Sequence, residues 1–324
     1  MISKLKKDLF LKMLRIRMVE LEISKRYHVE PKKMRCPIHL SVGQESVAVS
    51  VCKNLKKTDS IFTAHRSHAH YLAKGGSLKK MIAELHGRKT GCAGGAGGSM
   101  HLIDLNVNIL GAVPIVGSSI AVGVGKAWEN KLDNKDDIVV IFLGDGATEE
   151  GIFFESLDFA SLHDLKVIFV CENNYFSVYS HIKKRQSKYR NICKIAEATG
   201  IKSSHIKFHD YFSIYKNMKR IVQRVKKNSR PYFFQIDTFR NLEHCGPSND
   251  DHLGYRNNKF IKFWSKNDVV EKAKYELLRK KIISKKSLLS IEKKISLEIK
   301  KAFRFALKSP FPNKKTILNN IYKN

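Results

Sequence analysis

The stretch IVVIFLGDGATEEGIFFESLDFASLHDLKVIFVCENNYF, residues 138–176, decides the fold. It overlaps two apolar, β-branched-rich runs at 137–144 and 165–173, and such runs are typical of strands buried on both faces of a parallel sheet. A strand, a crossover helix and a second strand predict a parallel α/β sheet, and a third apolar run at 231–239 predicts a further strand. The segment between the first two runs has apolar residues at helical spacing: Phe153, Leu157 and Ala160.

A Gly-Asp-Gly turn, Gly144 to Gly146, follows the first of these runs. In parallel α/β sheets, ligands bind beyond the carboxyl ends of the strands, where helix N-termini point free N–H groups outward. The glycines permit a tight turn and a close approach of the backbone to a ligand. We expect a helix to start near Ala147 and Thr148, so that its N–H groups attract an anion.

Asp145 lies in the middle of this turn and on its own would repel an anion. A carboxylate next to an anion site therefore suggests a bridging divalent cation, and Mg²⁺ prefers oxygen ligands that include phosphate oxygens. Asn174 ends the neighbouring run and offers an amide oxygen to the same ion. For the Gly-Asp-Gly turn taken alone, the alternative is a plain strand-to-helix connection, and the pairing with Asn174 favours the metal site.

The whole chain has 324 residues, enough to bury a large core as one domain, or as one domain with a long appendage. No apolar run approaches the roughly 20 residues of a membrane span, and the Lys-rich start lacks an apolar signal core. The cysteines contain no C-x-x-C pair, which indicates a reducing compartment and neither a zinc site nor a disulfide framework. We expect a cytoplasmic protein with no membrane partner. The cysteines are Cys36, Cys52, Cys92, Cys171, Cys193 and Cys245.

The formal net charge of +30 suggests a nucleic-acid partner, because a basic surface neutralises phosphates. Residues 255–324 alone hold 20 Lys/Arg against 5 Asp/Glu. This tail has apolar residues at helical spacing, which places most of its lysines on the opposite, solvated face. We therefore expect no nucleic acid partner. The apolar positions are Leu288, Ile291, Ile295, Ile299, Ala302 and Ala306.

Three regions are expected along the chain. Residues 1–60 form an N-terminal helical segment. Residues 61–256 form the α/β core, which includes Gly-rich intervals at 91–101 and 111–125 where the backbone must come close to another group. Residues 257–324 form a Lys-rich helical segment packed on the same domain. The helical spacing of the first region is carried by Leu11, Leu14, Met18 and Leu21.

Eight segments, spread in order along nearly the whole chain, point to a family. They are IHLSVGQESVAV, FTAHRSHAHYLAKG, GGSMHLID, IVGSSIAVGVGKA, GDGATEEGIFFESLDFAS, CENNYFSV, HCGPSNDDHLGYR and FALKSPFP. The Gly-Asp-Gly turn, 26 intervening residues and Asn-Asn match the thiamine diphosphate motif. The sequence resembles the alpha subunit of the thiamine-diphosphate-dependent 2-oxo acid dehydrogenases, the decarboxylating component of the pyruvate, branched-chain and acetoin complexes. This resemblance implies a parallel-sheet, thiamine diphosphate-binding α/β fold with flanking helices and a helical C-terminal segment.

The resemblance implies that the chain binds thiamine diphosphate and Mg²⁺. Asp145, the side chain of Asn174 and the backbone carbonyl of Phe176 are then the protein ligands of the ion. Gly146 and Ala147 are expected to lend backbone contacts around the diphosphate. The cofactor carries the chemistry of decarboxylation in such enzymes, while the protein supplies positioning, a dry site and control of protonation.

Two further cofactor contacts depart from the family pattern. The family has a Tyr-Arg pair whose arginine holds the diphosphate. Here the pair is His65-Arg66, and Arg66 keeps the bidentate, charge-assisted contact. The family's G-I-V turn holds the aminopyrimidine ring through backbone groups, and here Pro114 takes its first position and Val116 its last. Proline keeps a carbonyl acceptor but has no N–H, so the contact at Pro114 has to use the oxygen.

Two of the thirteen histidines align with site residues of the family. His244, in EHCGPSNDDHLGYR, aligns with a histidine on a loop that borders the active site and is ordered by cofactor. His39, in IHLSVGQE, aligns with one that faces the substrate. Imidazole suits both positions, because a pKa near neutrality lets it donate or accept a proton and stabilise a developing oxyanion. We expect both to be catalytic. Further candidates are His65, His68 and His101, and a plain loop residue is the alternative for His252.

The resemblance also implies partners. In the family, the glutamate that activates the cofactor comes from a second, pyrimidine-binding domain, and only helix and a Lys-rich tail are expected here after the loop that carries His244. We therefore expect a separate beta subunit, in a two-alpha, two-beta heterotetramer, to complete the active site. The expected reaction is decarboxylation of a 2-oxo acid, with pyruvate as the expected substrate. The acyl group would pass to a lipoyl arm on an acyltransferase.

Three alternatives stay open. The first is an acetoin dehydrogenase or another stand-alone thiamine diphosphate enzyme acting on an unusual 2-oxo or sugar-derived substrate, since HCGPSNDDHLGYR departs from the family's common HSxSDD form. The second is a basic nucleic-acid-binding protein that is not catalytic, which the intact Asp145, Asn174 and Arg66 argue against. The third is a dinucleotide-binding oxidoreductase. The GxGxxG sequence that such enzymes carry after their first strand is not found here at that position.

Overall fold

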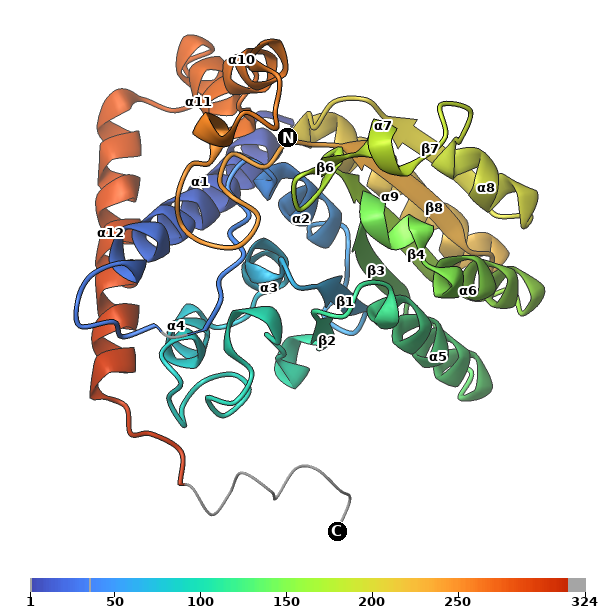
Figure 1. The fold of residues 1–324 in the computed structure, drawn as a ribbon, viewed down its shortest axis with the longest axis horizontal. Helices are drawn as coiled ribbons and strands as arrows, with labels where there is room; N and C mark the ends of the chain where they lie inside the picture. Colours follow the sequence, from blue (N-terminus) through green and yellow to red (C-terminus); the bar gives the residue numbers. More distant parts are fainter. Residues whose placement is uncertain (1, 35, 314–324) are drawn as a thin grey trace.

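The computed structural model describes residues 2–34 and 36–313, and a six-stranded parallel sheet lies at its centre (Figure 1). The strands of this sheet are β1 (Ser60–Ala64), β2 (Ile109–Val113), β3 (Val139–Gly144), β4 (Val167–Asn173), β7 (Lys202–Ile206) and β8 (Tyr232–Asp237). They pair in the order β2-β1-β3-β4-β8-β7, every pair parallel. The predicted parallel α/β fold is confirmed. A separate antiparallel hairpin joins β5 (Phe176–Ser177) and β6 (Ser180–His181).

The three apolar runs predicted as strands are β3, β4 and β8, each beginning slightly later than its run. The side chains of β3 alternate between two cores, with Val140 and Phe142 in one and Val139 and Ile141 in the other. A strand that buries both its faces has no polar side, which is why the sequence of β3 is apolar throughout. Apolar continuity therefore identified the centre of the sheet.

Helices cover both faces of the sheet (Figure 1). The first apolar core joins the sheet to α1, α2, α3, α4, α9, α11 and α12, and the second joins it to α5, α6 and α8. The helices are α1 (Ile2–Tyr27), α2 (Glu45–Cys52), α3 (His68–Lys74), α4 (Leu78–Leu85), α5 (Ser118–Leu132), α6 (Gly151–Leu162), α7 (Ile182–Arg185), α8 (Ile192–Ala198), α9 (Tyr211–Asn228), α10 (Asn258–Lys266), α11 (Val269–Arg279) and α12 (Lys285–Lys308). Short 3₁₀ turns occupy Gly98–Met100, Leu105–Val107, Asp145–Glu149 and Asp251–Leu253.

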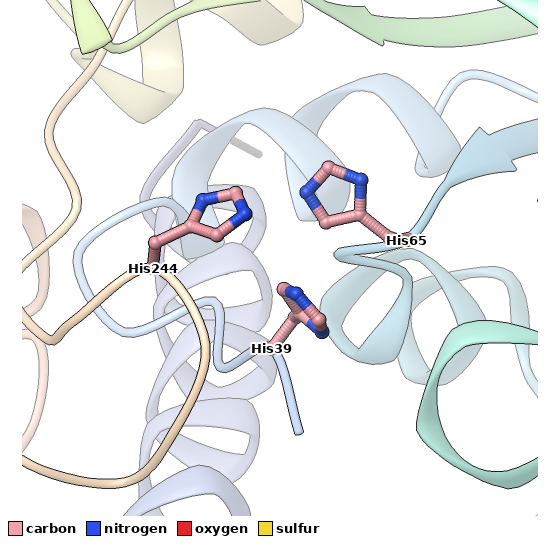
Figure 2. Close-up of side chains that lie close together, drawn as sticks. All are labelled: His39, His65 and His244. Carbon is pink, nitrogen blue, oxygen red and sulfur yellow. The ribbon is translucent and has the colours of Figure 1, made fainter. Parts of the chain in front are cut away.

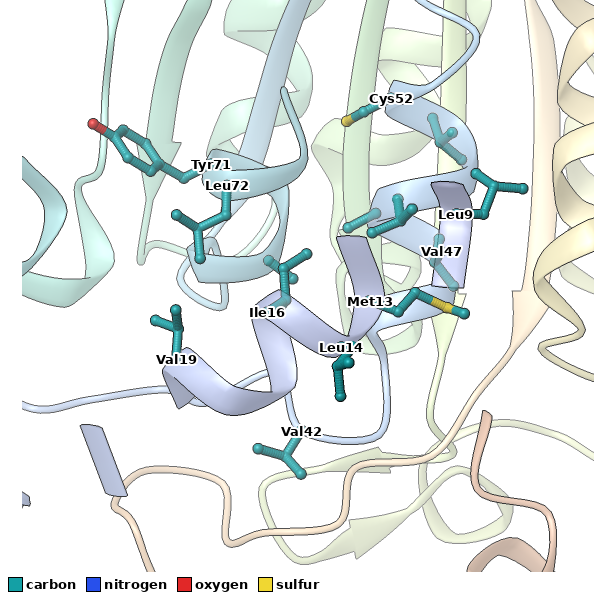
Figure 3. Close-up of a cluster of buried hydrophobic side chains, with 14 of the residues drawn as sticks. Leu9, Met13, Leu14, Ile16, Val19, Val42, Val47, Cys52, Tyr71 and Leu72 are labelled. Atoms are coloured by element: carbon teal, nitrogen blue, oxygen red, sulfur yellow. The ribbon is translucent and has the colours of Figure 1, made fainter. Parts of the chain in front are cut away.

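The N-terminal helix α1 is present as predicted, but the face assigned to it was only partly right. Leu14 is buried, whereas Leu21 has 47% of its surface exposed. Figure 3 shows the face that α1 turns inward, toward α2 and α3. Its buried apolar residues are Leu9, Phe10, Met13, Leu14, Ile16, Val19 and Ile23. Where one helix has two neighbouring apolar stripes, their spacing does not show which stripe is buried, because the tertiary contacts decide it.

The C-terminal helix α12 buries the face that the sequence predicted. Leu288, Ile295 and Ile299 are buried in the first core, while Lys293, Lys294 and Lys300 are exposed. The basic residues of α12 thus form a solvated helix face. The helix packs against α1 and α4, so the N-terminal and C-terminal regions meet. The proposed division at residues 60 and 256 stays a prediction.

The Gly-Asp-Gly turn leads into a 3₁₀ turn and only then into α6, which corrects the helix start expected at Ala147 and Thr148. Asp145–Glu149 form the 3₁₀ turn, and the Thr148 hydroxyl closes it by donating to the Asp145 carbonyl at 2.7 Å. Glu150 has extended backbone angles, φ −76 and ψ 142, so α6 begins at Gly151. The anion-attracting N–H groups near Ala147 belong to this turn and not to an α-helix.

The Gly-rich loop at 91–98 does approach another group closely, and that group is the Glu84 carboxylate of α4. Backbone N–H groups of Ala93, Gly95, Gly97 and Gly98 donate to Glu84 at 2.7–3.0 Å. Gly95 has a φ of +84, and a Cβ there would lie 2.7 Å from the Arg88 carbonyl oxygen. Glycine is required because the loop folds tightly around the buried acid. Along the described ranges, no helix has both the length and the apolarity to cross a bilayer.

Candidate active site

A pocket opens where the sequence analysis expected a ligand, beyond the carboxyl ends of β1, β3 and β4. Strand register brings these ends together, because Gly144 of β3 pairs with Glu172 of β4. The predicted cofactor and metal residues that line the pocket are His65, Arg66, Val116, Asp145, Gly146, Ala147, Asn174, Phe176 and His244. Pro114 is not among the lining residues, and His39 lies behind His65 and His244.

Asp145 is almost completely buried and meets a positive charge from α7. The Arg185 guanidinium donates to the carboxylates of Asp145 and Glu149. Burial raises the pKa of Asp145, and the charge of Arg185 opposes that rise. A buried carboxylate is stable only with a cation or a proton beside it. The turn therefore presents a carboxylate that needs a cation, and Arg185 fills that need here.

The two asparagines at the end of β4 point in different directions. Asn173 donates to Asp237 of β8 at 3.0 Å, and Tyr175 donates to the same carboxylate at 2.6 Å. Asn174 lines the pocket, and its Oδ1 accepts the N–H of Phe176 at 3.0 Å. Tyr175 takes a left-handed φ of 69 between them. This tight turn fixes Asn174 and the backbone of Phe176 on the same side as Asp145.

The residues at this turn fit a hard divalent cation. Asp145 and Asn174 bring a carboxylate and an amide to one pocket from adjacent strands, and oxygen donors of this kind suit Mg²⁺ better than softer metals. Gly144 has no neighbour within 4 Å of an added Cβ, which leaves open space beside Asp145. The Arg185 guanidinium at Asp145 shows that positive charge is accepted at this position.

Arg66 brings a positive charge to the opposite wall of the pocket. It donates to the carbonyl of Leu40 at 2.7 Å and to the carbonyl of His244 at 2.9 Å. No ion pair joins Arg66 to an acid within residues 2–34 and 36–313. Burial and the charge of Arg240 lower the pKa of Arg66 to about 9. An anionic ligand would balance this charge with a charge-assisted contact.

Three imidazoles, those of His39, His65 and His244, lie together (Figure 2), and Arg66 contacts the His244 ring. Ring centroids are 4.7 Å apart for His39 and His65, 5.2 Å for His39 and His244, and 5.3 Å for His65 and His244. Burial, with the charge of Arg66 next, lowers the pKa of His39 to about 2, of His65 to about 4 and of His244 to about 3. All three rings are therefore neutral at pH 7.

Three polar groups of the pocket were missed by the sequence analysis. Glu172 lies 2.9 Å from His70 through its Oε2, and its buried Oε1 has no hydrogen-bond partner in the described chain. The buried Oε1 of Gln44 is likewise without one. All three residues line the pocket. Unpartnered buried acceptors suggest a polar ligand. Glu172 directly precedes the Asn-Asn pair, so its position in β4 was the available signal.

The remaining histidine candidates lie outside the pocket. His68 is buried in an internal network, with Nδ1 2.8 Å from Glu20 and Nε2 2.7 Å from the Ser99 hydroxyl. That network ties α1, α3 and the Gly-rich loop together. His252 is exposed on the loop after His244, and His101 is partly buried at the end of the Gly-rich loop. None of the three lines the pocket.

Comparison with known proteins assigns the family. The model for the dehydrogenase E1 component matches residues 12–315. The chain belongs to this family. It is 33% identical to the pyruvate dehydrogenase E1 component subunit alpha of Rickettsia bellii, over 88% of this chain and 86% of the relative. It is also 33% identical to the alpha subunit of the acetoin:2,6-dichlorophenolindophenol oxidoreductase of Bacillus subtilis, over 88% of this chain and 84% of the relative.

Membership confirms the resemblance stated from the sequence. A third relative, the chloroplastic pyruvate dehydrogenase E1 component subunit alpha-3 of Arabidopsis thaliana, is 34% identical over 88% of this chain and 67% of its own length. The chain is thus an enzyme subunit of the thiamine-diphosphate-dependent 2-oxo acid dehydrogenase class, and the family implies thiamine diphosphate as its cofactor. The alpha-subunit relatives imply a beta subunit as its partner.

Proposed function

We propose that this chain is the alpha subunit of an enzyme that decarboxylates pyruvate. The observation that carries the proposal is the convergence of Asp145 and Asn174 on one pocket that also holds the unpaired charge of Arg66. An oxygen-lined metal site opposite a buried guanidinium suits a metal-bound diphosphate. The relatives named for pyruvate dehydrogenase support pyruvate as the substrate.

Mg²⁺ is part of this proposal. Asp145, the side chain of Asn174 and the backbone carbonyl of Phe176 would bind the ion, and Arg185 would leave Asp145 when the ion arrives. Gly146 and Ala147 would face the diphosphate, and Arg66 would bind its oxygens from the other wall. A Cβ at position 146 would lie 3.2 Å from the Ser177 hydroxyl, so glycine keeps this wall open. Val116, and Pro114 through its carbonyl, would hold the aminopyrimidine ring.

Bound thiamine diphosphate supplies the carbon nucleophile and the electron sink for loss of CO₂. The chain would position the substrate and control its protons. His39 and His244 are neutral, so each can donate one N–H to a developing oxyanion. Arg66 holds His244 and Leu40, which follows His39, by their backbone carbonyls. This double contact fixes the separation between the two catalytic candidates.

A beta subunit would complete the site, in a two-alpha, two-beta heterotetramer, with a lipoyl-bearing acyltransferase as the acceptor of the acyl group. The described chain places no further domain over the pocket. Ile115 and Val116, next to the pocket, have 71% and 46% of their surfaces exposed, and exposed apolar residues at a site favour a protein partner. We also propose a cytoplasmic location, since all six cysteines are free and a reducing compartment keeps them so.

Calorimetric titration of the alpha–beta assembly tests the metal site. Thiamine diphosphate in excess Mg²⁺ should bind the wild-type assembly, and Asp145→Ala or Asn174→Ala should weaken binding by about 100-fold, equivalent to about 2.8 kcal/mol. Asp136→Ala is the matched control, because Asp136 lies before the other end of β3 and pairs with Lys166. Unchanged binding in both site variants, with correct assembly, would remove the proposal.

A second candidate function is acetoin cleavage, which the Bacillus subtilis relative favours by its name. Turnover of pyruvate and of acetoin by the same alpha–beta assembly separates the two. Acylation of a lipoyl domain with pyruvate as donor would support pyruvate dehydrogenase activity. Faster turnover of acetoin with an artificial electron acceptor would instead support the second candidate.

A further inference from the structure

His65 lines the cofactor pocket at the position of the family's tyrosine, and the proposed function gives it no contact of its own. It follows β1 directly, and its ring forms a triangle with the rings of His39, which precedes α2, and His244, on the loop after β8 (Figure 2). Each histidine offers one ring nitrogen, and these three atoms all lie within 4.8 Å of one another. Segments far apart in the sequence therefore bring three imidazoles to one point.

The backbone under this cluster is held before any ligand arrives. Gly246 donates its N–H to the Ile38 carbonyl at 2.8 Å, and His39 pairs with Gly246 in an isolated parallel bridge. Arg66 adds contacts to the carbonyls of Leu40 and His244. The bridge and the two contacts of Arg66 thus connect the three segments, so a ligand would meet a largely pre-arranged site, which lowers the cost of binding.

The protein gives the nitrogens of these three rings few hydrogen-bond partners. His39 is 6% exposed, and its Nδ1 is buried without a hydrogen-bond partner in the described chain. Across those same residues, the one hydrogen bond to any of the three rings is a long contact of 3.5 Å between Arg66 and His244 Nδ1. A buried imidazole nitrogen without a partner is rare, and it commonly marks a missing ligand or catalytic use.

We propose that His39, His65 and His244 form a binding site for a divalent transition-metal ion of the zinc class. Three imidazoles are a frequent set of protein ligands for such ions, with the fourth position left to water or to an anion. This site differs from the oxygen-lined site at Asp145, because nitrogen ligands favour zinc, cobalt or nickel over Mg²⁺. The fourth position faces the cofactor pocket, which His65 and His244 line.

The geometry needs only a small adjustment. Zn–N bonds of about 2.0–2.1 Å place two nitrogens of a tetrahedral site about 3.4 Å apart, so the rings have to close by at most about 1.4 Å. Rotations of the side chains supply such a movement without moving the backbone. The neutral state of the rings helps, because a metal displaces no proton from them at pH 7.

The charge of Arg66 acts against a bare cation at this position. An anionic fourth ligand, hydroxide or a carboxylate, would balance both the ion and Arg66. Binding would occupy the two imidazoles that the proposed function assigns to the developing oxyanion, so the ion would inhibit the enzyme. This inhibitory consequence rests on the proposed function, whereas binding of the metal does not.

The binding test is a titration of the alpha–beta assembly with Co²⁺ in excess Mg²⁺, followed by visible absorption. One saturable Co²⁺ per alpha chain with strong, tetrahedral-type absorption is expected, and Zn²⁺ should displace it. His65→Phe keeps a ring of similar size but removes one ligand, so affinity should fall by about 100-fold. His252→Phe is the control, because His252 is exposed on the same loop as His244.

Three outcomes would overturn the proposal: no saturable Co²⁺ absorption in the wild type, equal affinity in His65→Phe, or equal loss in His252→Phe. Circular dichroism and assembly with the beta subunit show whether His65→Phe is folded, and if it is not, His244→Phe replaces it in the same test. Zn²⁺ inhibition that EDTA reverses, followed in the wild type, tests the consequence separately. The Co²⁺ titration measures binding and does not depend on decarboxylase activity. The metal-site proposal and the proposed function can therefore be contradicted separately.

Discussion

The Gly-rich loop at 91–98 and the Gly-Asp-Gly turn at 144–146 are both rich in glycine. They differ in whether the charged groups beside them have partners within this chain. In the loop, four backbone N–H groups donate to Glu84 of the same chain. Asp145 of the turn is paired with Arg185 of the same chain. In the pocket beside the turn, however, Arg66 has no acidic partner in the described chain, and Glu172 keeps an unpartnered oxygen. Glycine thus indicates a close approach of the backbone. Only the structure shows whether the protein or a ligand is approached.

The largest effect is expected from breaking the internally balanced loop. Glu84→Ala removes the acceptor of four partly buried N–H groups, and an unsatisfied buried donor costs about 1–3 kcal/mol before relaxation. We expect the free energy of unfolding to fall by at least about 3 kcal/mol, as measured by urea denaturation. Glu155→Ala, on the exposed face of α6, is the control and should change stability by less than about 0.5 kcal/mol. A small effect of Glu84→Ala would mean that the loop keeps its conformation without the Glu84 carboxylate.

The sequence predicted the turn better than the loop for a physical reason. Asp145 and Asn174 follow apolar strands whose parallel pairing fixes where their side chains go, and strand periodicity is visible in the sequence. Glu84 sits in a helix that gives no sign of its partner, because the hydrogen bonds arrive from residues about ten positions later. The buried face of α1 was only partly predicted for the same reason, since Leu21 and Leu14 have similar hydrophobicity and different neighbours.

Contacts between distant segments were the hardest to predict. Arg185 meets Asp145 from a helix of four residues after the β5–β6 hairpin, and nothing in its sequence points toward that partner. His39, His65 and His244 were singled out one by one, yet their convergence depends on the Gly246 bridge and on Arg66. Sequence motifs identified the chemistry, and the tertiary fold decided which groups meet.

The second-largest effect is expected from removing the positive charge that the chain itself places at the Gly-Asp-Gly turn. Arg185→Gln removes the guanidinium from Asp145 and keeps an amide that can still bind Glu149. Since Mg²⁺ and Arg185 compete for one carboxylate, the metal should bind about tenfold more tightly, a gain of about 1.4 kcal/mol. Mg²⁺ titration calorimetry with thiamine diphosphate present measures it. Lys184→Gln, the exposed neighbour, controls for net charge. Weaker Mg²⁺ binding in Arg185→Gln would show that Arg185 supports the site.

The third effect concerns pH. Burial, together with the charges of Arg66 and Arg240, lowers the pKa of His65 to about 4, below its unfolded value of about 6.5. Unfolding therefore takes up a proton between these values, so the stability is full above pH 6.5 and falls as the pH falls toward 4. His65→Phe should reduce the loss of stability between pH 7.5 and pH 5.5 by about 1 kcal/mol, after allowance for partial exposure.

Denaturant curves at both pH values measure this difference, and His252→Phe serves as the exposed control. The control should leave the pH dependence of the wild type unchanged. An equally steep loss of stability in His65→Phe would show that folding does not lower the pKa of His65.

The smallest effect is expected at Pro114, where the backbone lacks an N–H donor. Pro114 follows β2 and lies outside the residues that line the pocket, so any contact with the aminopyrimidine would use its carbonyl. Pro114→Ala restores the N–H and keeps that oxygen. Thiamine diphosphate affinity, measured by calorimetry on the alpha–beta assembly, should then change by less than about threefold, or about 0.6 kcal/mol. A gain well beyond threefold would mean that a missing N–H contact limits cofactor binding, and the turn at 114–116 would join Arg66 as a group whose partner is the ligand.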